Sequence, residues 1–157
     1  MTDTERTAGP STEPELSRQA RTIRLGPGGS TVEVLATPAE TGGAVSVYRW
    51  RMAPSGRGPD PHFHTTFGET FVVEQGEVAH FDGRSWRTLR PGDTAHAAAG
   101  GVHALRKENA GPAVLLMVLT PGVPREEYFA QLATADEQDL DRLHRDHDNH
   151  FVAPRGR

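Results

Sequence analysis

GRGPDPHFHTTFGETFVVEQG is the sequence of residues 56–76, and it brings two histidines and a glutamate close together in the chain. His62 and His64 are two residues apart, so on a β-strand their side chains share one face and converge on one ion. Glu69 lies an odd number of residues beyond His64 and would point to the opposite face of an unbroken strand. The spacer of residues 65–68 ends in a glycine and is long enough to turn or bulge. We therefore predict a break there that brings Glu69 back to the histidines.

A third histidine, His103, completes the candidate ligand set. It closes a segment that begins at Gly92-Asp93, and Gly100-Gly101 prepares a turn just before it, which favours a fourth ligand on a neighbouring strand. An isolated His-x-His pair more often consists of exposed surface histidines than of metal ligands. The added carboxylate and third imidazole favour one divalent transition-metal ion. The chain has no cysteine, so the ion would be Fe, Mn, Ni, Cu or Zn held by nitrogen and oxygen.

The composition restricts the remaining classes of function. A chain of 157 residues suits one domain with a single hydrophobic core. The formal net charge of -4 and the lack of basic clusters argue against nucleic acid or an anionic membrane as a partner, and a small-molecule substrate is expected. Because no apolar signal segment opens the chain, a cytoplasmic location is expected. The polar residues 1–20 are predicted to be a disordered N-terminal tail.

Residues 21–122 show short runs of β-type residues separated by turn signals, as in an all-β barrel or sandwich. The expected strands cover residues 22–25, 31–35, 44–52, 69–74, 78–81, 84–89, 94–98, 103–108 and 114–119. Asp82-Gly83 predicts a type I′ hairpin turn, which needs a positive φ at both central positions. Such a turn would set Phe81 opposite the Ser85-Trp86 end of the next strand.

Residues 123–153 change character and are predicted to form helices that pack on the barrel. Pro124 favours the start of a first helix, because proline is tolerated in the first helical turn. Thr134 and Glu137 have the spacing of a capping box and predict the start of a second helix. An exposed polar face, rather than a second metal site, is expected for the last histidines, which are His144, His147 and His150.

The chain resembles the cupin superfamily in two motifs. Every defining position of the first cupin motif is matched, by Gly56, His62, His64, Glu69 and Gly76. The second motif is matched at Gly92, Gly100 and His103, with Ala98 where the family has proline and Lys107 where it has asparagine. Neither departure removes a metal ligand.

Flanking segments extend the resemblance to single-domain quercetin 2,3-dioxygenase-like cupins. These segments are Glu40-Thr41-Gly42-Gly43 and Thr120-Pro121-Gly122, the latter followed by a helix with Tyr128-Phe129. The likeness covers residues 22–153. It implies a single cupin domain over residues 21–122, a double-stranded β-helix or jelly-roll barrel with the metal inside, followed by a short C-terminal helical segment. Cupins often pair through sheet edges, so a homodimer is also expected.

Three imidazoles and one carboxylate leave open positions on a bound ion, and Glu69 is our candidate catalytic base. Quercetinase-like cupins bind an enolic or phenolic oxygen at the metal while dioxygen cleaves the ring. The resemblance therefore implies a dioxygenase acting on a flavonol- or polyketide-like molecule. Related cupins use the same ligands for cyclisation, isomerisation and epimerisation, and a non-catalytic binding protein is a third interpretation, so the reaction class stays open.

Strand parity predicts which residues line the substrate pocket beside the metal. Phe71 and Val73 share the face of Glu69 on one strand. The preceding strand presents Tyr48, Trp50 and Met52 on one face. An ordinary hydrophobic core predicts the same pattern, so both interpretations stay open at this point. Two further strand histidines, expected behind the ligands or on the surface rather than at the ion, are His80 and His96.

Overall fold

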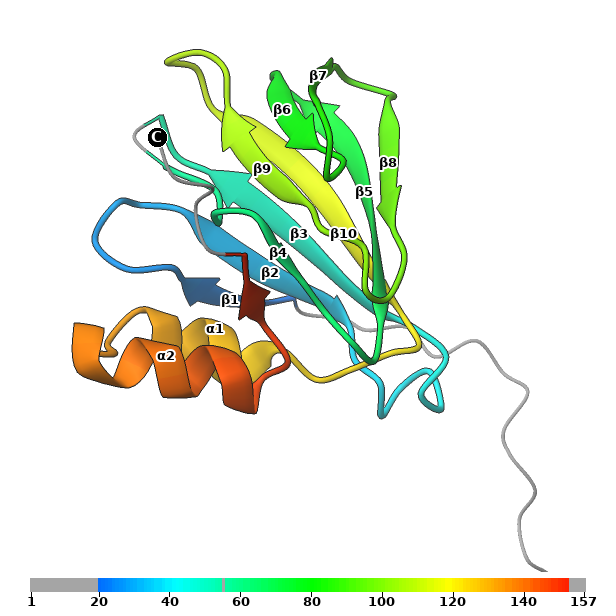
Figure 1. Cartoon of the computed structure of the whole chain (residues 1–157), viewed down its shortest axis with the longest axis vertical. Coiled ribbons are helices and arrows are strands. Elements are labelled where there is room, and N and C mark those ends of the chain that lie inside the picture. The colour runs from blue at the N-terminus through cyan, green and yellow to red at the C-terminus, as the bar shows by residue number, and fades with distance from the viewer. Residues whose placement is uncertain (1–19, 55, 153–157) are drawn as a thin grey trace, which may run out of the picture.

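The structure is a computed structural model that describes residues 20–54 and 56–152 (Figure 1). The strands are β1 (Arg21–Arg24), β2 (Thr31–Ala36), β3 (Ser46–Met52), β4 (His62–Phe63), β5 (Gly68–Gln75), β6 (Val78–Phe81), β7 (Trp86–Leu89), β8 (Thr94–Ala97), β9 (Ala104–Lys107), β10 (Ala113–Thr120) and β11 (His150–Phe151). The helices are α1 (Glu126–Leu132) and α2 (Glu137–Asp146). The predicted all-β fold with a short C-terminal helical segment is confirmed. Residues 1–19 of the predicted tail lie outside the described residues.

The strands form two antiparallel sheets and one small additional pair. The larger sheet has the order β1-β2-β3-β10-β5-β8, and the smaller sheet has the order β7-β6-β9. The additional pair joins β11 to β4, the strand that carries His62. Figure 1 shows both helices beside β1, at the opposite end of the molecule from β7 and β8. The C-terminal segment therefore packs against a sheet edge and then reaches the strand that carries a candidate ligand.

The core lies on one face of β3, β5 and β10. Buried residues alternate there with half-buried or exposed ones, as a strand with one face on the core requires. Leu115 of β10 is fully buried and pairs with Trp50 on one side and Val73 on the other. The expected strands lie where the observed strands do. The expected ranges did not include β4 or β11, because a strand of two residues is too short to show a periodic pattern.

The hairpin between β6 and β7 differs from the predicted type I′ turn. Gly83 has a φ of 91°, but neither Asp82 nor Arg84 has a positive φ, so only one central position is left-handed. The carboxylate of Asp82 instead closes the loop, since it accepts a hydrogen bond from the backbone N–H of Arg84 at 2.9 Å. The strand pairing is as predicted, with Phe81 opposite Trp86.

Helix α2 begins later than the capping-box spacing predicted. Thr134 and Ala135 donate their backbone N–H groups to the carbonyl of Gln131, so they belong to the turn that ends α1. Asp136 is the N-cap residue of α2, although its side chain makes no capping hydrogen bond. Neither helix in the described part of the chain is long and apolar enough to cross a membrane.

Candidate metal centre

His62 and His103 face each other across a single antiparallel bridge. The backbone N–H of His62 donates to the carbonyl of His103 at 3.0 Å, and the reciprocal hydrogen bond measures 2.8 Å. Backbone hydrogen bonds therefore hold together two candidate ligands that are far apart in the sequence.

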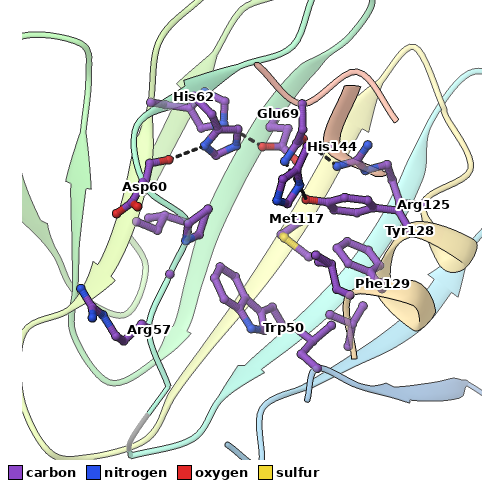
Figure 2. Close-up of a pocket in the computed structure, with 18 of the residues that line it drawn as sticks. Trp50, Arg57, Asp60, His62, Glu69, Met117, Arg125, Tyr128, Phe129 and His144 are labelled. Carbon is purple, nitrogen blue, oxygen red and sulfur yellow. Dashed lines mark hydrogen bonds and ion pairs between the residues drawn. The ribbon is translucent and has the colours of Figure 1, made fainter. Parts of the chain in front are cut away.

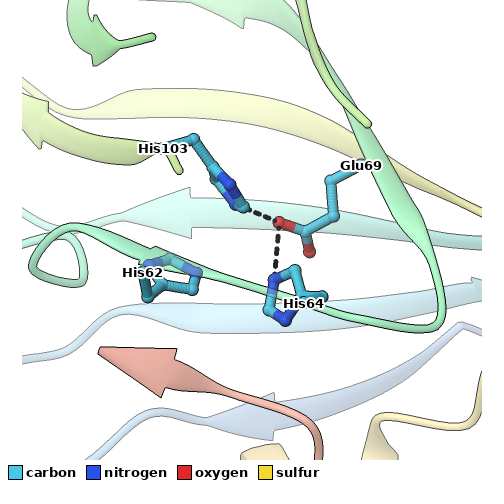
Figure 3. Close-up of side chains that lie close together, drawn as sticks. All are labelled: His62, His64, Glu69 and His103. Atoms are coloured by element: carbon cyan, nitrogen blue, oxygen red, sulfur yellow. Dashed lines mark hydrogen bonds and ion pairs between the residues drawn. The ribbon is translucent and has the colours of Figure 1, made fainter. Parts of the chain in front are cut away.

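The predicted break between His64 and Glu69 is present. Strand β4 ends at Phe63 and β5 begins at Gly68, so the intervening segment belongs to neither strand. A glycine is needed at the start of β5, because a Cβ there would lie 2.9 Å from the carbonyl oxygen of Ala97. Glu69 consequently turns toward the histidines, as Figure 3 shows.

Asp148 holds this break in place from the C-terminal segment. Its carboxylate accepts hydrogen bonds from the backbone N–H and the hydroxyl of both Thr65 and Thr66, at 2.7 to 3.0 Å. Its backbone carbonyl accepts a bond from Nδ1 of His64 at 2.8 Å. Burial raises the pKa of Asp148, but the hydrogen bonds from the two threonines outweigh burial and hold the pKa well below its usual range. One residue thus fixes both the loop and a candidate ligand.

The four candidate ligands are all buried, and their ligand atoms lie within 4.8 Å of one another. Oε2 of Glu69 lies 2.9 Å from Nε2 of His103 and 3.3 Å from Nε2 of His64. The rings of His62 and His103 have centroids 4.5 Å apart. Ligand atoms that each bind one ion at about 2.1 Å lie roughly 3 to 4 Å from one another, so the cluster has the dimensions of a site for one ion.

A backbone carbonyl fixes the orientation of each histidine ring. The pairs are Nδ1 of His62 with Asp60 at 2.8 Å, Nδ1 of His64 with Asp148 at 2.8 Å and Nδ1 of His103 with Gly101 at 2.9 Å. A carbonyl only accepts, so each Nδ1 carries a hydrogen, and a ring in its neutral form presents the lone pair of Nε2 to the centre. Lone pairs and a carboxylate repel one another unless a cation lies between them. The donor set therefore fits a metal ion.

Burial and the hydrogen bonds among the candidate ligands control their protonation. Burial lowers the pKa of His62 to about 3, which keeps this ring neutral. Burial raises the pKa of Glu69, but hydrogen bonds from His103 and His64 outweigh it and hold the pKa well below its usual range. Burial lowers the pKa of His103, but its hydrogen bond to Glu69 outweighs that effect and raises the pKa. A neutral imidazole and an ionised carboxylate are the forms that bind metal, so an ion that binds here displaces the proton that Nε2 of His103 donates to Glu69.

The candidate metal centre opens into a cavity of about 460 Å³ (Figure 2). His62, Glu69 and His103 form part of its wall. The rest of the wall is largely apolar and aromatic, with Trp50, Phe71, Met117, Tyr128, Phe129 and Phe151. A cavity of this size with few polar groups is typical of a site for a small molecule.

Only part of the predicted pocket wall borders this cavity. Trp50 and Phe71 line it, as expected from strand parity. Tyr48, Met52 and Val73 do not line it and lie in the closed core instead. Parity predicts the face on which a side chain lies but not its depth along the barrel, and at the depth of these three residues the interior is filled.

The C-terminal segment supplies cavity residues that the sequence pattern did not reveal, namely Arg125, Tyr128, His144 and Asn149. The hydroxyl of Tyr128 accepts a hydrogen bond from Nδ2 of Asn149 at 2.7 Å and lies 3.1 Å from Nδ1 of His144. The exposed polar face predicted for the last histidines is wrong, because His144, His147 and His150 are each half-buried. Helix α2 packs on α1 and turns His144 toward the cavity. The only sequence signal was the concentration of histidine and aromatic residues after residue 127.

His80 and His96 lie outside the cluster of potential ligands found among the described residues. His80 is buried beside Phe71, with ring centroids 6.1 Å apart, and no described atom is a hydrogen-bond partner for its Nε2. His96 is exposed on β8 and lies 2.8 Å from the hydroxyl of Thr70. The two histidines therefore occupy a buried and a surface position behind the site.

Replacing Asp148 by alanine is expected to weaken metal binding about 10- to 100-fold, the usual effect of removing a group that supports a ligand. The loop of Thr65 and Thr66 loses its acceptor in this variant and no longer holds His64 and Glu69 at a fixed distance. Competition with a chelator of known affinity measures the change. Asp146→Ala is the matched control, because Asp146 is exposed at the end of α2. Equal affinity in both variants would contradict the role of Asp148.

Comparisons with known proteins agree with this architecture. The family model described as "Cupin domain" matches residues 48–119. A solved structure of a conserved protein with a double-stranded β-helix domain from Klebsiella pneumoniae is 25% identical, with a TM-score of 0.53 over 64% of this chain and 84% of that chain. A protein from Thermus thermophilus is 27% identical, with a TM-score of 0.54 over 63% and 90% of the two chains.

A solved structure with lower sequence identity shares the same fold. The polyketide cyclase RemF from Streptomyces resistomycificus is 14% identical, with a TM-score of 0.55 over 76% of this chain and 97% of that chain, which is a likeness of fold alone. The search of curated proteins found no match. The family model covers both matched motifs and most strands of the antiparallel barrel, so residues 48–119 of the chain are a cupin domain.

Proposed function

We propose that this chain is a metal-dependent dioxygenase that acts on an aromatic or enolic small molecule of the flavonol or polyketide type. One observation carries the proposal. The buried cluster of three histidines and Glu69 opens directly onto a cavity whose wall is largely apolar and includes several aromatic rings. Trp50 and Phe71 offer apolar ring surfaces to a flat substrate beside the metal centre.

A divalent transition-metal ion bound by the four residues supplies Lewis acidity, which attracts an enolic or phenolic oxygen and favours its ionised form. Glu69 accepts the proton that this oxygen loses. Its Oε2 is engaged by His64 and His103, whereas Oε1 takes part in no hydrogen bond among the described residues. We assign the proton to Oε1 for this reason. The aromatic wall excludes water from the reacting atoms.

A metal-dependent cyclase, isomerase or epimerase of secondary metabolism is the second candidate. It is favoured by a second pair of proton-transfer groups on the same cavity wall, the hydroxyl of Tyr128 and Nδ1 of His144, which lie 3.1 Å apart. Burial raises the pKa of Tyr128 to about 12, so the hydroxyl keeps its proton and can donate it. Moving a double bond or closing a ring needs one group to remove a proton and another to return one.

The experiment that separates these candidates combines metal analysis with oxygen uptake. The purified protein is offered a panel of flavonols and polyketide-like phenols, with and without oxygen. We expect stoichiometric metal and oxygen consumption that depends on the phenol. Turnover that proceeds without oxygen would replace the dioxygenase by the cyclase or isomerase. Metal and tight ligand binding without any turnover would indicate a non-catalytic binding protein.

Replacing Glu69 by alanine is expected to reduce turnover by about 100- to 10,000-fold, the usual range for loss of a positioned base. The barrel should remain folded, because Glu69 lies at the cavity and not within the apolar core cluster. Steady-state kinetics and circular dichroism measure the two effects. Glu74→Ala serves as the control, since Glu74 is exposed on the same strand. Full activity in the Glu69 variant would show that the proton goes elsewhere.

A further inference from the structure

Arg125 is a buried cation on the wall of the cavity. Only 4% of its surface is exposed, and it lies just before α1. Its guanidinium carbon lies 4.0 Å from the ring centroid of Tyr128 and 5.4 Å from that of Phe67, so aromatic surface holds the group in place. Figure 2 shows Arg125 with Tyr128 and His144 on the same side of the cavity as Glu69, whereas Arg57 lies on the opposite side.

The guanidinium is only partly satisfied by the protein. One terminal nitrogen donates to the backbone carbonyl of His147, and the other donates to Oδ1 of Asn149 at 2.9 Å. Both acceptors are neutral. A guanidinium has five N–H groups, and Arg125 also makes a side-chain hydrogen bond with Tyr128, so neutral acceptors of the protein engage only part of the group. Arg125 also forms no ion pair with any described carboxylate, although buried charges in proteins are usually paired.

The two carboxylates that influence Arg125 through space are already engaged. Glu69 and Asp148 both favour its charged form, against burial, which lowers its pKa. The oxygen atoms of Asp148 are occupied by the Thr65 and Thr66 loop. Glu69 belongs to the candidate ligand set, in which its charge is shared with the metal centre. A buried cation is thus left facing a cavity without a counter-charge of its own.

We propose that Arg125 binds an anionic oxygen of the substrate, so that the natural ligand is an aromatic or enolic acid carrying a carboxylate in addition to the oxygen that faces the metal centre. This inference rests on the proposed function, because it places that ligand in the same cavity. Planar guanidinium groups suit carboxylates, since two parallel N–H groups meet two oxygens. Asn149 supports this geometry by accepting from Arg125 while donating to Tyr128.

A pair of ligands of nearly the same shape, one anionic and one neutral, tests the inference on the unaltered protein. The probes are 6-hydroxy-2-naphthoate and 6-hydroxy-2-naphthamide, in which the phenol and the second group lie too far apart to chelate one ion. Calorimetric titration is performed with metal-free and zinc-loaded protein at neutral pH. We expect the carboxylate to bind about 10- to 100-fold more tightly in both states, as for a charge-assisted hydrogen bond. Equal affinities would overturn the inference.

Three variants locate the source of the preference. Arg125→Met should abolish it, and Arg125→Lys should retain part of it. Arg57→Met is the matched control, because Arg57 is an exposed arginine on the opposite wall of the same cavity and should leave the preference intact. Loss of the preference with Arg57→Met would overturn the assignment to Arg125. If Arg125→Met does not fold, the comparison of the two ligands on the unaltered protein still tests whether the cavity prefers a carboxylate.

The outcomes also separate this inference from the proposed function. Metal binding and turnover of neutral phenols, without any preference for the carboxylate, would reject the role of Arg125 and leave the enzyme assignment in place. A preference for the carboxylate in a protein that shows no turnover would reject the enzyme assignment and keep the role of Arg125. It would leave Arg125 as the recognition residue of a binding protein.

Discussion

A protein that carries both His62→Ala and His64→Ala is expected to purify without stoichiometric transition metal. Each substitution removes one of the imidazoles whose Nε2 faces the buried centre. Removing even a group that supports a ligand costs roughly 10- to 100-fold in affinity, so losing two ligands should lower the affinity by more than about 1,000-fold. Elemental analysis of the purified protein, followed by titration with zinc against a competing chelator, measures the loss.

His96→Ala is the matched control for this experiment. His96 is also a strand histidine, but it is exposed and points away from the cluster. Its variant should keep the metal content of the unaltered protein. Circular dichroism should show a folded barrel in all variants, because neither His62 nor His64 belongs to the apolar core cluster. Unchanged metal content in the double variant would refute the site.

The candidate site could be predicted from the sequence because most of its geometry is local. His62, His64 and Glu69 lie within eight residues, and strand parity required a break that the structure contains. His103 is distant in sequence, but glycine turns just before it indicated a strand end near the site. Alternation of apolar residues likewise predicted the central strands β3 and β10, since each has one face on the core.

The features that the sequence did not reveal depend on contacts between residues that are far apart in the chain. Asp148 accepts a hydrogen bond from the loop at Thr65, which lies 83 residues earlier in the chain. Asp148 also has a positive φ of 56°, which no local sequence pattern predicts. Arg125 has the sequence context of an ordinary surface arginine before a helix, but Phe67, Tyr128 and the residues that follow α2 contact it in the fold and bury it. Periodicity describes which face of one element is apolar. It contains no information about which distant element covers that face.

Leu115→Ala, near the middle of β10, is expected to cause the largest loss of stability among single core substitutions. It should lower the free energy of unfolding by about 3 kcal/mol, within a usual range of roughly 2 to 5 kcal/mol. Leu115 has no exposed surface and lies between Trp50 of β3 and Val73 of β5, so truncation leaves a void that neighbouring strands cannot fill. For a chain of this size the melting temperature should fall by about 2 to 4 °C per kcal/mol.

Leu116→Ala provides the control within the same strand. Leu116 is half-buried on the opposite face of β10, where it pairs with Arg49 and Val72, and its truncation should cost about 1 kcal/mol or less. Urea unfolding of metal-free protein compares the two variants without any contribution from bound metal. Similar losses for both would mean that β10 does not have one face on the core. The cavity wall is built on that same face, so the position of Trp50 beside the metal centre would then lose its structural basis.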